Sequence, residues 1–270
     1  EECAALCREA GLSFIEMNMN LPQYQVETMD EHHLKRVAKE YGIDYRSPAF
    51  PIHKKGHYGA FIGKGFSDFD EYERLLDEVE LCGGDFVKLM ISGLIDFSKK
   101  DTLTEESLSA QDIYTMVESA HKRGFAVMAH ANGDKAVLAA LDAGVESIEH
   151  GAFLSFETLR RMAYSNTVWV PTLSTIGNLI GSGRFPDEIL SPLLQTQQEK
   201  VAFFGAQGGL VGFGSDAGAF RVPHIQGTVS EYDYLKAVLK QDTERHLTAS
   251  ESFIKEHFKK KTLAKKTLKT

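Results

Sequence analysis

AVMAHANGDKAVLAALDAGVESIEHG, residues 126–151, is the stretch that decides the fold. It opens with a short apolar run that ends at His130, and the polar turn Asn132-Gly133-Asp134 then offers capping side chains to a helix. Apolar residues follow at helical spacing, and Gly144 stands where a left-handed C-terminal cap needs a residue without a side chain. A second apolar run leads to His150, so the stretch predicts a strand, a helix and a second strand.

His130 and His150 therefore fall at the ends of two neighbouring strands. A strand–helix–strand unit is parallel and almost always right-handed, so both histidines lie at the same edge of the sheet. Adjacent strands are about 4.8 Å apart, which lets two imidazoles share one metal ion or a pair of them. Ligands of α/β sheets bind at this edge.

The whole chain repeats one sequence pattern. An amphipathic helix ends near a turn, usually at glycine, and a short apolar strand follows. The seven predicted helix–strand pairs are Glu2–Ala10 with Ser13–Asn20, Asp30–Tyr41 with Ile43–Phe50, Phe69–Leu81 with Phe86–Ser92, Ala110–Arg123 with Phe125–His130, Lys135–Ala143 with Val145–His150, Phe156–Tyr164 with Thr167–Leu173, and Pro192–Ala206 with Leu210–Asp216. Helical sequence continues from about Ser230 to the end.

This alternation predicts parallel strands with helices packed outside. A doubly wound sheet would fit it too, but no glycine-rich phosphate-binding fingerprint follows any strand, which favours a (β/α)8 TIM-type barrel. At 270 residues and 43% hydrophobic, one barrel domain spanning residues 1–270 is expected. Its core is expected to include one residue from each of several strands: Ile15, Phe86, Val127, Ile148 and Val170, or their neighbours of the same parity.

Charge and composition exclude several classes of partner. The net charge is −8, and residues 255–270 carry seven lysines and one glutamate, which leaves −14 for the rest. An acidic body argues against nucleic acid, and the lysine-rich tail is most simply a solvated last helix. There is no apolar run of membrane-spanning length and no signal peptide. With Cys3, Cys7 and Cys82 as reduced thiols, we expect a cytoplasmic protein without a membrane partner; a homo-oligomer is compatible with the sequence.

Four positions could carry chemistry. Lys88 lies inside an apolar strand, where it must snorkel, pair with an acid such as Asp216, or be chemically altered, because an unpaired buried ammonium is costly. Taken singly, His130 and His150 could be hydrogen-bonded core residues, and Asp216 could cap a helix. Together they occupy four separate strands, and a barrel directs the carboxyl ends of its strands at one spot.

Five ordered motifs carry a resemblance: VKLMISG with Lys88, VMAHANGD with His130, SIEHG with His150, WVPTL with Pro171-Thr172, and GFGSDAG with Asp216. They resemble the metal-dependent amidohydrolase superfamily, in particular its imidazolonepropionase-related and prolidase-like branch, over residues 10–240. The resemblance implies that Lys88 is carboxylated and bridges two divalent metals, usually zinc. It also implies that His130 and His150 hold the second metal and that Asp216 binds the first.

The implied activity is hydrolysis of a C–N bond in a small molecule, such as an N-acyl amino acid, a cyclic amide or a dipeptide, by a metal-bound hydroxide. Asp216 would take the proton of the attacking water and deliver it to the leaving nitrogen. His57 and Tyr58, in the loop HKKGHYG, resemble the substrate-facing loop of the family, and His224 follows Asp216. These three are the predicted substrate-binding residues, although ordinary loop polarity would explain them as well.

One departure from the family pattern matters. The first metal of the family needs a His-x-His motif at the end of the first strand, and this sequence has none. His32-His33 are expected to face solvent on a helix. His53 and His57 could replace the His-x-His ligands in principle, but a lysine-rich loop makes a poor rigid metal site. We therefore expect an N-terminally incomplete barrel with a gap between the strands Ser13–Asn20 and Leu210–Asp216 and half of a binuclear centre. The alternative function is a catalytically inactive barrel that serves as a binding or scaffold protein.

Overall fold

The computed structural model describes residues 8, 14–15 and 30–261. Its strands are β1 (Phe14–Ile15), β2 (Asp44–Tyr45), β3 (Pro51–Lys54), β4 (Lys64–Phe66), β5 (Val87–Met90), β6 (Val127–Ala131), β7 (Ser147–His150), β8 (Val168–Val170) and β9 (Leu210–Val211). Its helices are α2 (Glu31–Glu40), α3 (Phe69–Leu81), α4 (Ala110–Lys122), α5 (Asp134–Ala143), α6 (Phe156–Ala163), α7 (Ser174–Gly177), α8 (Asp187–Ala206), α9 (Gln226–Leu239), the 3₁₀ turn η3 (Lys240–Asp242) and α10 (Thr243–His257).

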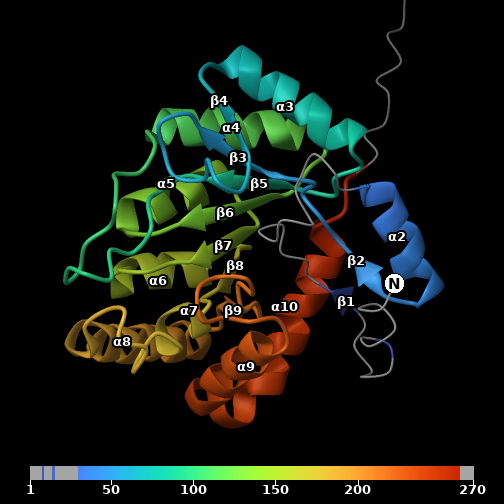
Figure 1. Cartoon of the computed structure of the whole chain (residues 1–270). Coiled ribbons are helices and arrows are strands. Elements are labelled where there is room, and N and C mark those ends of the chain that lie inside the picture. Colours follow the sequence, from blue (N-terminus) through green and yellow to red (C-terminus); the bar gives the residue numbers. More distant parts are fainter. Residues whose placement is uncertain (1–7, 9–13, 16–29, 262–270) are drawn as a thin grey trace, which may run out of the picture.

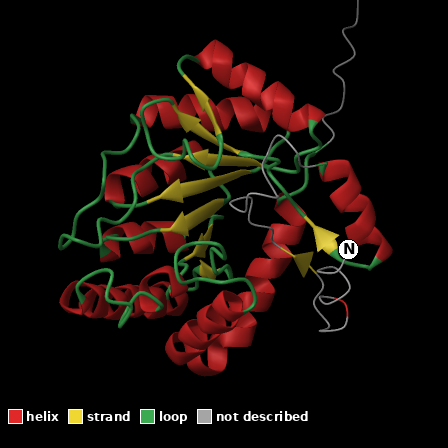
Figure 2. Cartoon of the chain, in the orientation of Figure 1, coloured by secondary structure: helices red, strands yellow, loops and turns green. Residues whose placement is uncertain are grey.

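Seven strands form one parallel sheet in the order β4-β3-β5-β6-β7-β8-β9. From β5 to β9 the spatial order follows the chain, with a helix between each pair of strands. The arrows of β5, β6 and β7 point the same way, and α3, α4, α5, α6 and α8 run along the outside of the sheet (Figures 1 and 2). The predicted α/β architecture, a parallel sheet of the TIM-barrel type, is confirmed.

The sheet differs from the prediction at its first edge. The expected strand 43–50 is reduced to β2, which pairs with β1 in a separate two-stranded sheet. The strand of the main sheet begins only at Pro51, so His53 lies on β3 rather than in a loop. β4 was not predicted, because three residues with a single buried side chain, Phe66, show no readable periodicity. Residues 13 and 16–20 of the expected strand 13–20 lie outside the described residues, as does the expected helix 2–10 except for residue 8.

Within residues 30–261 the main sheet has two edges, since β4 and β9 each pair with only one neighbour. Among the described residues β9 is therefore an edge strand, on one side of the predicted seam. On the other side the edge is formed by β4 and not by the strand at 13–20.

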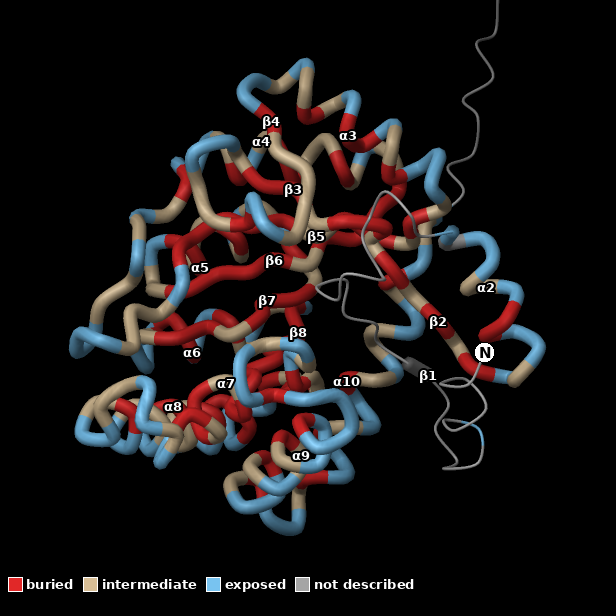
Figure 3. The backbone as a smooth tube through the Cα atoms, in the orientation of Figure 1, coloured by how far each residue is buried: buried red, intermediate tan, exposed pale blue. Residues whose placement is uncertain are grey.

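Alternate side chains of each strand face the helices, and those between them face the interior where the site lies. Val127 and Ile148 belong to the main hydrophobic cluster with residues of α3 and α4, whereas Phe86 belongs to another cluster with Ala126 and Phe258. Successive strand residues point to opposite faces, so Val127 and Ile148 face the helices and not the interior as expected. Phe86 and Val170 are buried as predicted, and the side chain of Ile15 lies outside the described part. Figure 3 shows the buried strands beneath partly exposed helices.

Local sequence explains most helix boundaries. Side chains cap the first turns of α2, α3, α4 and α6, and each accepts the backbone N–H three residues on: Asp30, Asp68, Ser109 and Ser155. Gly144 ends α5 in the left-handed conformation, with φ of 88°. α8 begins at Asp187 rather than at the expected Pro192, which lies inside the helix in its second turn.

The C-terminal helix α10 closes the amino-terminal side of the strands. Phe258 follows this helix, is 1% exposed and meets the Phe86 ring edge-on at 5.1 Å. The Lys261 N–H donates to the Gly124 carbonyl at 2.9 Å, and Lys260 pairs with Glu80 at 2.5 Å. The first residues of the lysine-rich tail, up to residue 261, therefore contact the rest of the protein.

In the described part of the chain, none of the helices combines the length and the apolar character needed to cross a bilayer. Cys82 is exposed and free, and Cys3 and Cys7 lie outside the described residues.

Replacing Phe258 by alanine should lower the free energy of unfolding by about 3–5 kcal/mol, because a fully buried aromatic ring and its packing on Phe86 are lost. Urea unfolding followed by circular dichroism measures the change. Tyr164→Ala is the control, since Tyr164 is 83% exposed. Equal midpoints for the two variants would show that α10 does not close the sheet in solution.

Candidate active site

Two histidines meet at the carboxyl edge of the sheet. His130 is the fourth residue of β6 and His150 the last of β7. In the parallel register His130 lies opposite Glu149, and Ala131 opposite His150. The two imidazole rings approach edge-on with their centroids 4.7 Å apart. The structure thus brings together the pair predicted from residues 126–151.

Hydrogen bonding fixes which nitrogen of His130 is free. Nε2 lies 3.2 Å from the Gly93 carbonyl, to which only a protonated nitrogen can donate. Nδ1 is buried and has no hydrogen-bond partner in the described residues. Burial holds the pKa of His130 well below its usual range, and His150 and Lys88 lower it further. The ring is therefore neutral, with a lone pair on Nδ1 ready to bind a cation.

His150 presents the opposite nitrogen. Its Nδ1 lies 2.7 Å from Thr172 Oγ1, and its Nε2 has no hydrogen bond in the part of the chain that the structure describes. Its backbone is left-handed, with φ of 68°, and the Trp169 indole and the Gln197 amide both donate to its carbonyl at 3.0 Å. Desolvation, followed by the charge of Lys88, lowers the pKa of His150 to about 3.

Lys88 and Asp216 share the electrostatic environment of the histidines. Lys88 lies on β5 between Val87 and Leu89, which pack against the helices, so its side chain faces the interior. It lowers the pKa of both histidines. Asp216, with φ of 53°, is exposed as a residue, but the protein around its carboxylate raises its pKa by desolvation and Lys88 opposes that shift.

A second carboxylate, Glu149, lies on β7 next to His150. It is 7% exposed and accepts a short hydrogen bond from Ser147. Burial raises its pKa, Lys88 lowers it and Asp216 raises it. The interior beneath the histidines is thus a cluster of opposite charges removed from water.

The predicted substrate residues fall into two places. Tyr58 packs on His130 with ring centroids 4.8 Å apart, and burial together with Asp216 raises the pKa of its hydroxyl. His57, its neighbour, is instead directed at Glu105, with 3.6 Å between Nδ1 and Oε1. The Tyr58 N–H donates to the same carboxylate at 2.8 Å. The structure therefore brings Tyr58 to the histidines and does not bring His57 there.

His224 lines a cavity of about 760 Å³ between the end of α7, the segment after Asp216 and the first turns of α9. Gly218 and Ala219, just after Asp216, form part of the wall together with Arg221 and with Asn178 from the end of α7. No acidic side chain lines this cavity, and the Arg221 guanidinium has no partner among the described residues. The cavity is therefore suited to a negatively charged group.

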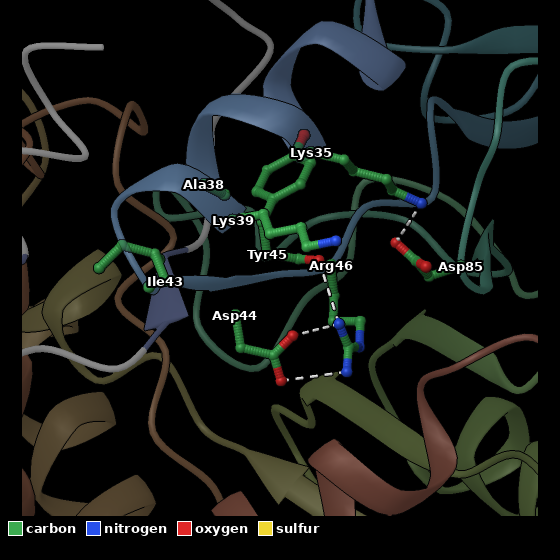
Figure 4. A pocket seen from close by; sticks show the side chains of 9 residues that line it. Lys35, Ala38, Lys39, Ile43, Asp44, Tyr45, Arg46 and Asp85 are labelled. Carbon is green, nitrogen blue, oxygen red and sulfur yellow. Dashed lines mark hydrogen bonds and ion pairs between the residues drawn. The ribbon is translucent and has the colours of Figure 1, made fainter.

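A cavity of about 420 Å³ between α2 and the segment around β2 contains none of the predicted site residues. Its charged side chains are largely paired, as Figure 4 shows: Lys35 with Asp85 at 2.9 Å, and Arg46 with both oxygens of Asp44. Lys39 also lines it. The pairing leaves little charge to recognise a ligand there.

The residues around the histidines fit one metal ion better than two. His130 Nδ1 and His150 Nε2 are unpaired nitrogens of neutral rings, the form that binds metals. Lys88 can join them only as a carbamate. In residues 30–261 no group of three or more His, Cys, Asp or Glu could hold a metal ion. His53 is buried on β3 and bonds the Lys54 carbonyl at 3.1 Å, and His32 and His33 are exposed on α2 as predicted.

Sequence reasoning missed the residues that hold these side chains in place. Asn132, expected as a helix cap, donates instead to the Gly93 carbonyl at 3.0 Å and accepts the Ala152 N–H at 2.9 Å. Gly133 is the N-cap of α5, without a side-chain bond. Asn132 thereby ties together the loops after β5, β6 and β7. The only sequence signal for this role was its position two residues after His130.

Structural comparison finds solved proteins that share this architecture. A prolidase complexed with N-methylphosphonate-L-proline superposes with a TM-score of 0.74 at 20% identity, covering 97% of this chain and 67% of that protein. A Xaa-Pro dipeptidase with bound methionine gives 0.71 at 18% identity, over 94% and 66%. Aspergillus niger ochratoxinase gives 0.68 at 18% identity, over 90% and 61%. The chain has the amidohydrolase fold.

Sequence comparison agrees over a shorter stretch. Ochratoxinase of Aspergillus niger is 29% identical over 100 residues, which are 37% of this chain and 21% of that protein. An uncharacterised Mycobacterium tuberculosis protein is 35% identical over 74 residues, 26% of this chain and 20% of its own length. No protein-family model matches the chain. The resemblance to the amidohydrolase superfamily is confirmed, and the matches span about a fifth of these curated relatives.

Replacing Asn132 by alanine should lower the free energy of unfolding by about 2–4 kcal/mol. The Ala152 N–H would be left buried without a partner, at about 1–3 kcal/mol, and the Gly93 carbonyl would lose one of its two donors and keep only His130, at about 0.5–1.5 kcal/mol for the lost bond. Chemical denaturation measures the loss. Asn166→Ala is the matched control, because Asn166 is exposed in a turn and should change stability by less than about 0.5 kcal/mol. A loss no greater than that of the control would contradict the bridging role of Asn132.

Proposed function

We propose that this chain is the barrel of a metal-dependent amidohydrolase that cleaves the C–N bond of a small amide. The observation that carries the proposal is the buried pair His130 and His150, held neutral with opposite nitrogens unpaired at the end of two adjacent parallel strands. Leaving Nδ1 of His130 buried and unpartnered is costly and is explained if a cation binds it.

The metal ligands would be His130 Nδ1, His150 Nε2 and carboxylated Lys88. The Lys88 ammonium would first lose a proton, and its neutral amine would then add CO₂ and release a second proton, which turns the cation into a carbamate anion with two oxygens. A second zinc ion would have Lys88 and Asp216 as its ligands among the described residues. When bound, such ions lower the pKa of a water and polarise a carbonyl.

Asp216 is the proposed proton carrier. It would accept the proton of the attacking water and pass it to the leaving nitrogen, so that the amine departs uncharged. Its desolvated carboxylate, with the pKa raised, holds a proton more readily than an exposed aspartate does. Tyr58, whose hydroxyl stays protonated, is placed against His130 to donate a hydrogen bond to substrate, and His57 would steady that loop through Glu105.

The substrate we favour carries a carboxylate, as an N-acyl amino acid or a dipeptide does. The cavity lined by Gly218 and Ala219 supports this, since Arg221 and His224 also line it and none of the described residues in its wall is acidic. A neutral cyclic amide would leave Arg221 without a partner. The names of the structural relatives, prolidase and Xaa-Pro dipeptidase, agree with a substrate of this class.

A catalytically inactive barrel that binds a ligand is the second candidate. The observation in its favour is that no three metal-binding His, Cys, Asp or Glu side chains gather within residues 30–261. Metal content separates the two functions, because only the hydrolase requires a bound ion.

Zinc titration of chelator-treated protein tests the proposal. Wild type should bind zinc, and His130→Ala and His150→Ala should each weaken binding by more than about 100-fold, since altering second-shell contacts alone costs 10–100-fold. His121→Ala is the control, because His121 pairs with Glu146 at 3.2 Å on the outer side of the sheet. If all four proteins bind zinc alike, or wild type binds none, the inactive barrel is the better account.

Arg221→Gln should raise KM for an N-acetyl amino acid by about 10–100-fold, because a hydrogen bond to a charged group is worth about 1.5–3 kcal/mol. KM for the corresponding N-acetyl amino acid amide should stay within about twofold. Arg245→Gln, which removes an exposed partner of Asp242, should leave both values unchanged. Equal effects of Arg221→Gln on acid and amide would refute carboxylate recognition by this cavity.

A further inference from the structure

Thr172, just after β8, is held in an unfavourable conformation. Its φ is 48° and it is only 2% exposed. A β-branched residue in the left-handed region is a genuine outlier, and such strain costs about 1–3 kcal/mol. Glycine or asparagine would make the same turn more easily, so the turn alone does not explain a threonine.

A buried network holds this turn in place. Glu231 of α9 is fully buried, and its carboxylate accepts the N–H of Leu173 at 3.0 Å and of Ser174 at 2.6 Å. The Thr172 carbonyl accepts the N–H and the hydroxyl of Thr175 at 3.0 and 2.8 Å. These bonds all involve the backbone on the carboxyl side of Thr172, and none of them uses the Thr172 hydroxyl.

The hydroxyl of Thr172 contacts His150. Its Oγ1 lies 2.7 Å from His150 Nδ1, and the His150 carbonyl is held by Trp169 and Gln197. Since Nδ1 faces Thr172, Nε2 is the nitrogen left for the interior, where Lys88 and the His130 ring lie. A positive charge at Lys88 favours a lone pair on the nitrogen that faces it. This favours the arrangement in which His150 Nδ1–H donates to Thr172 Oγ1 over the one in which the hydroxyl donates to the ring.

We propose that Thr172 and Glu231 are positioning residues that hold His150 in the Nδ1–H tautomer, so that Nε2 is always free to bind metal. Glu231 acts through the backbone of Leu173 and Ser174, Thr172 acts through its hydroxyl, and neither touches the substrate. The inference rests on the proposed function, in which His150 is a metal ligand. The fixed tautomer is nevertheless a property of the metal-free chain.

Nitrogen-15 NMR of the imidazoles in metal-free protein tests the tautomer directly. Wild type should show His150 protonated at Nδ1 and His130 protonated at Nε2, opposite states in one spectrum. Thr172→Val keeps the branched side chain but removes the acceptor, so a substantial part of the His150 signal should shift to the Nε2–H form. Thr172→Ser should restore the wild-type spectrum, and Glu231→Gln, which loses one acceptor, should resemble Thr172→Val.

Thr167→Val is the matched control. Thr167 is also buried near β8, and its hydroxyl donates to the Val145 carbonyl at 2.9 Å, so its loss should cost stability without changing the tautomer of His150. In zinc titrations Thr172→Val should bind about 10–100-fold more weakly than wild type, while Thr172→Ser and Thr167→Val should bind like wild type.

The outcomes separate this inference from the proposed function. A wild-type His150 protonated at Nε2, or a Thr172→Val variant with an unchanged tautomer, overturns the positioning role whether or not zinc binds. Zinc binding that is lost in His150→Ala but unaffected in Thr172→Val also overturns it and leaves the proposed function standing. A protein that shows the expected tautomers but binds no zinc refutes the metal-dependent hydrolase alone.

Discussion

The site depends on keeping two imidazole rings neutral and 4.7 Å apart inside the protein. Two charged imidazoles at that distance would repel each other, and desolvation makes either charge still more costly. A neutral ring has one N–H, which needs an acceptor when it is buried, and one nitrogen with a lone pair, which must stay free if it is to bind a cation. Gly93 supplies the partner of His130 and Thr172 that of His150, so the loops after β5 and β8 are as much a part of the site as the strands that carry the histidines.

Most of the fold could be predicted because the residues that end its helices and strands are neighbours in the sequence. Glycine after a helix and apolar runs between helices located α3 to its last residue and β5 to β9 in their order. The errors lie where local signals are weak or misleading. β4 has three residues and no periodicity, and Pro192 suggested a helix start that lies five residues earlier, at Asp187. Successive side chains of a strand point to opposite faces. Since His130 and Glu149 point to the interior, Val127 and Ile148, at the opposite parity, face the helices.

The candidate site was predictable only in part, for a physical reason. Lys88, His130, His150 and Asp216 could be placed from sequence because parallel topology brings the ends of all strands to one edge. The residues that orient them come from elsewhere in the chain: Glu231 is 58 positions from Leu173, and Gln197 is 47 from His150. No spacing rule relates such residues, because their contacts exist only after the helices have packed on the sheet.

Backbone strain is concentrated at the same edge. His150, Thr172 and Asp216 close three successive strands, and all three have positive φ, at 68°, 48° and 53°. None is glycine, so the strain at each, about 1–3 kcal/mol, must be offset by the buried core and by bonds such as those of Trp169, Gln197 and Glu231. A site made only to stabilise the fold would place glycine at these turns. Retaining side chains there is what allows an imidazole, a hydroxyl and a carboxylate to gather at the mouth of one sheet.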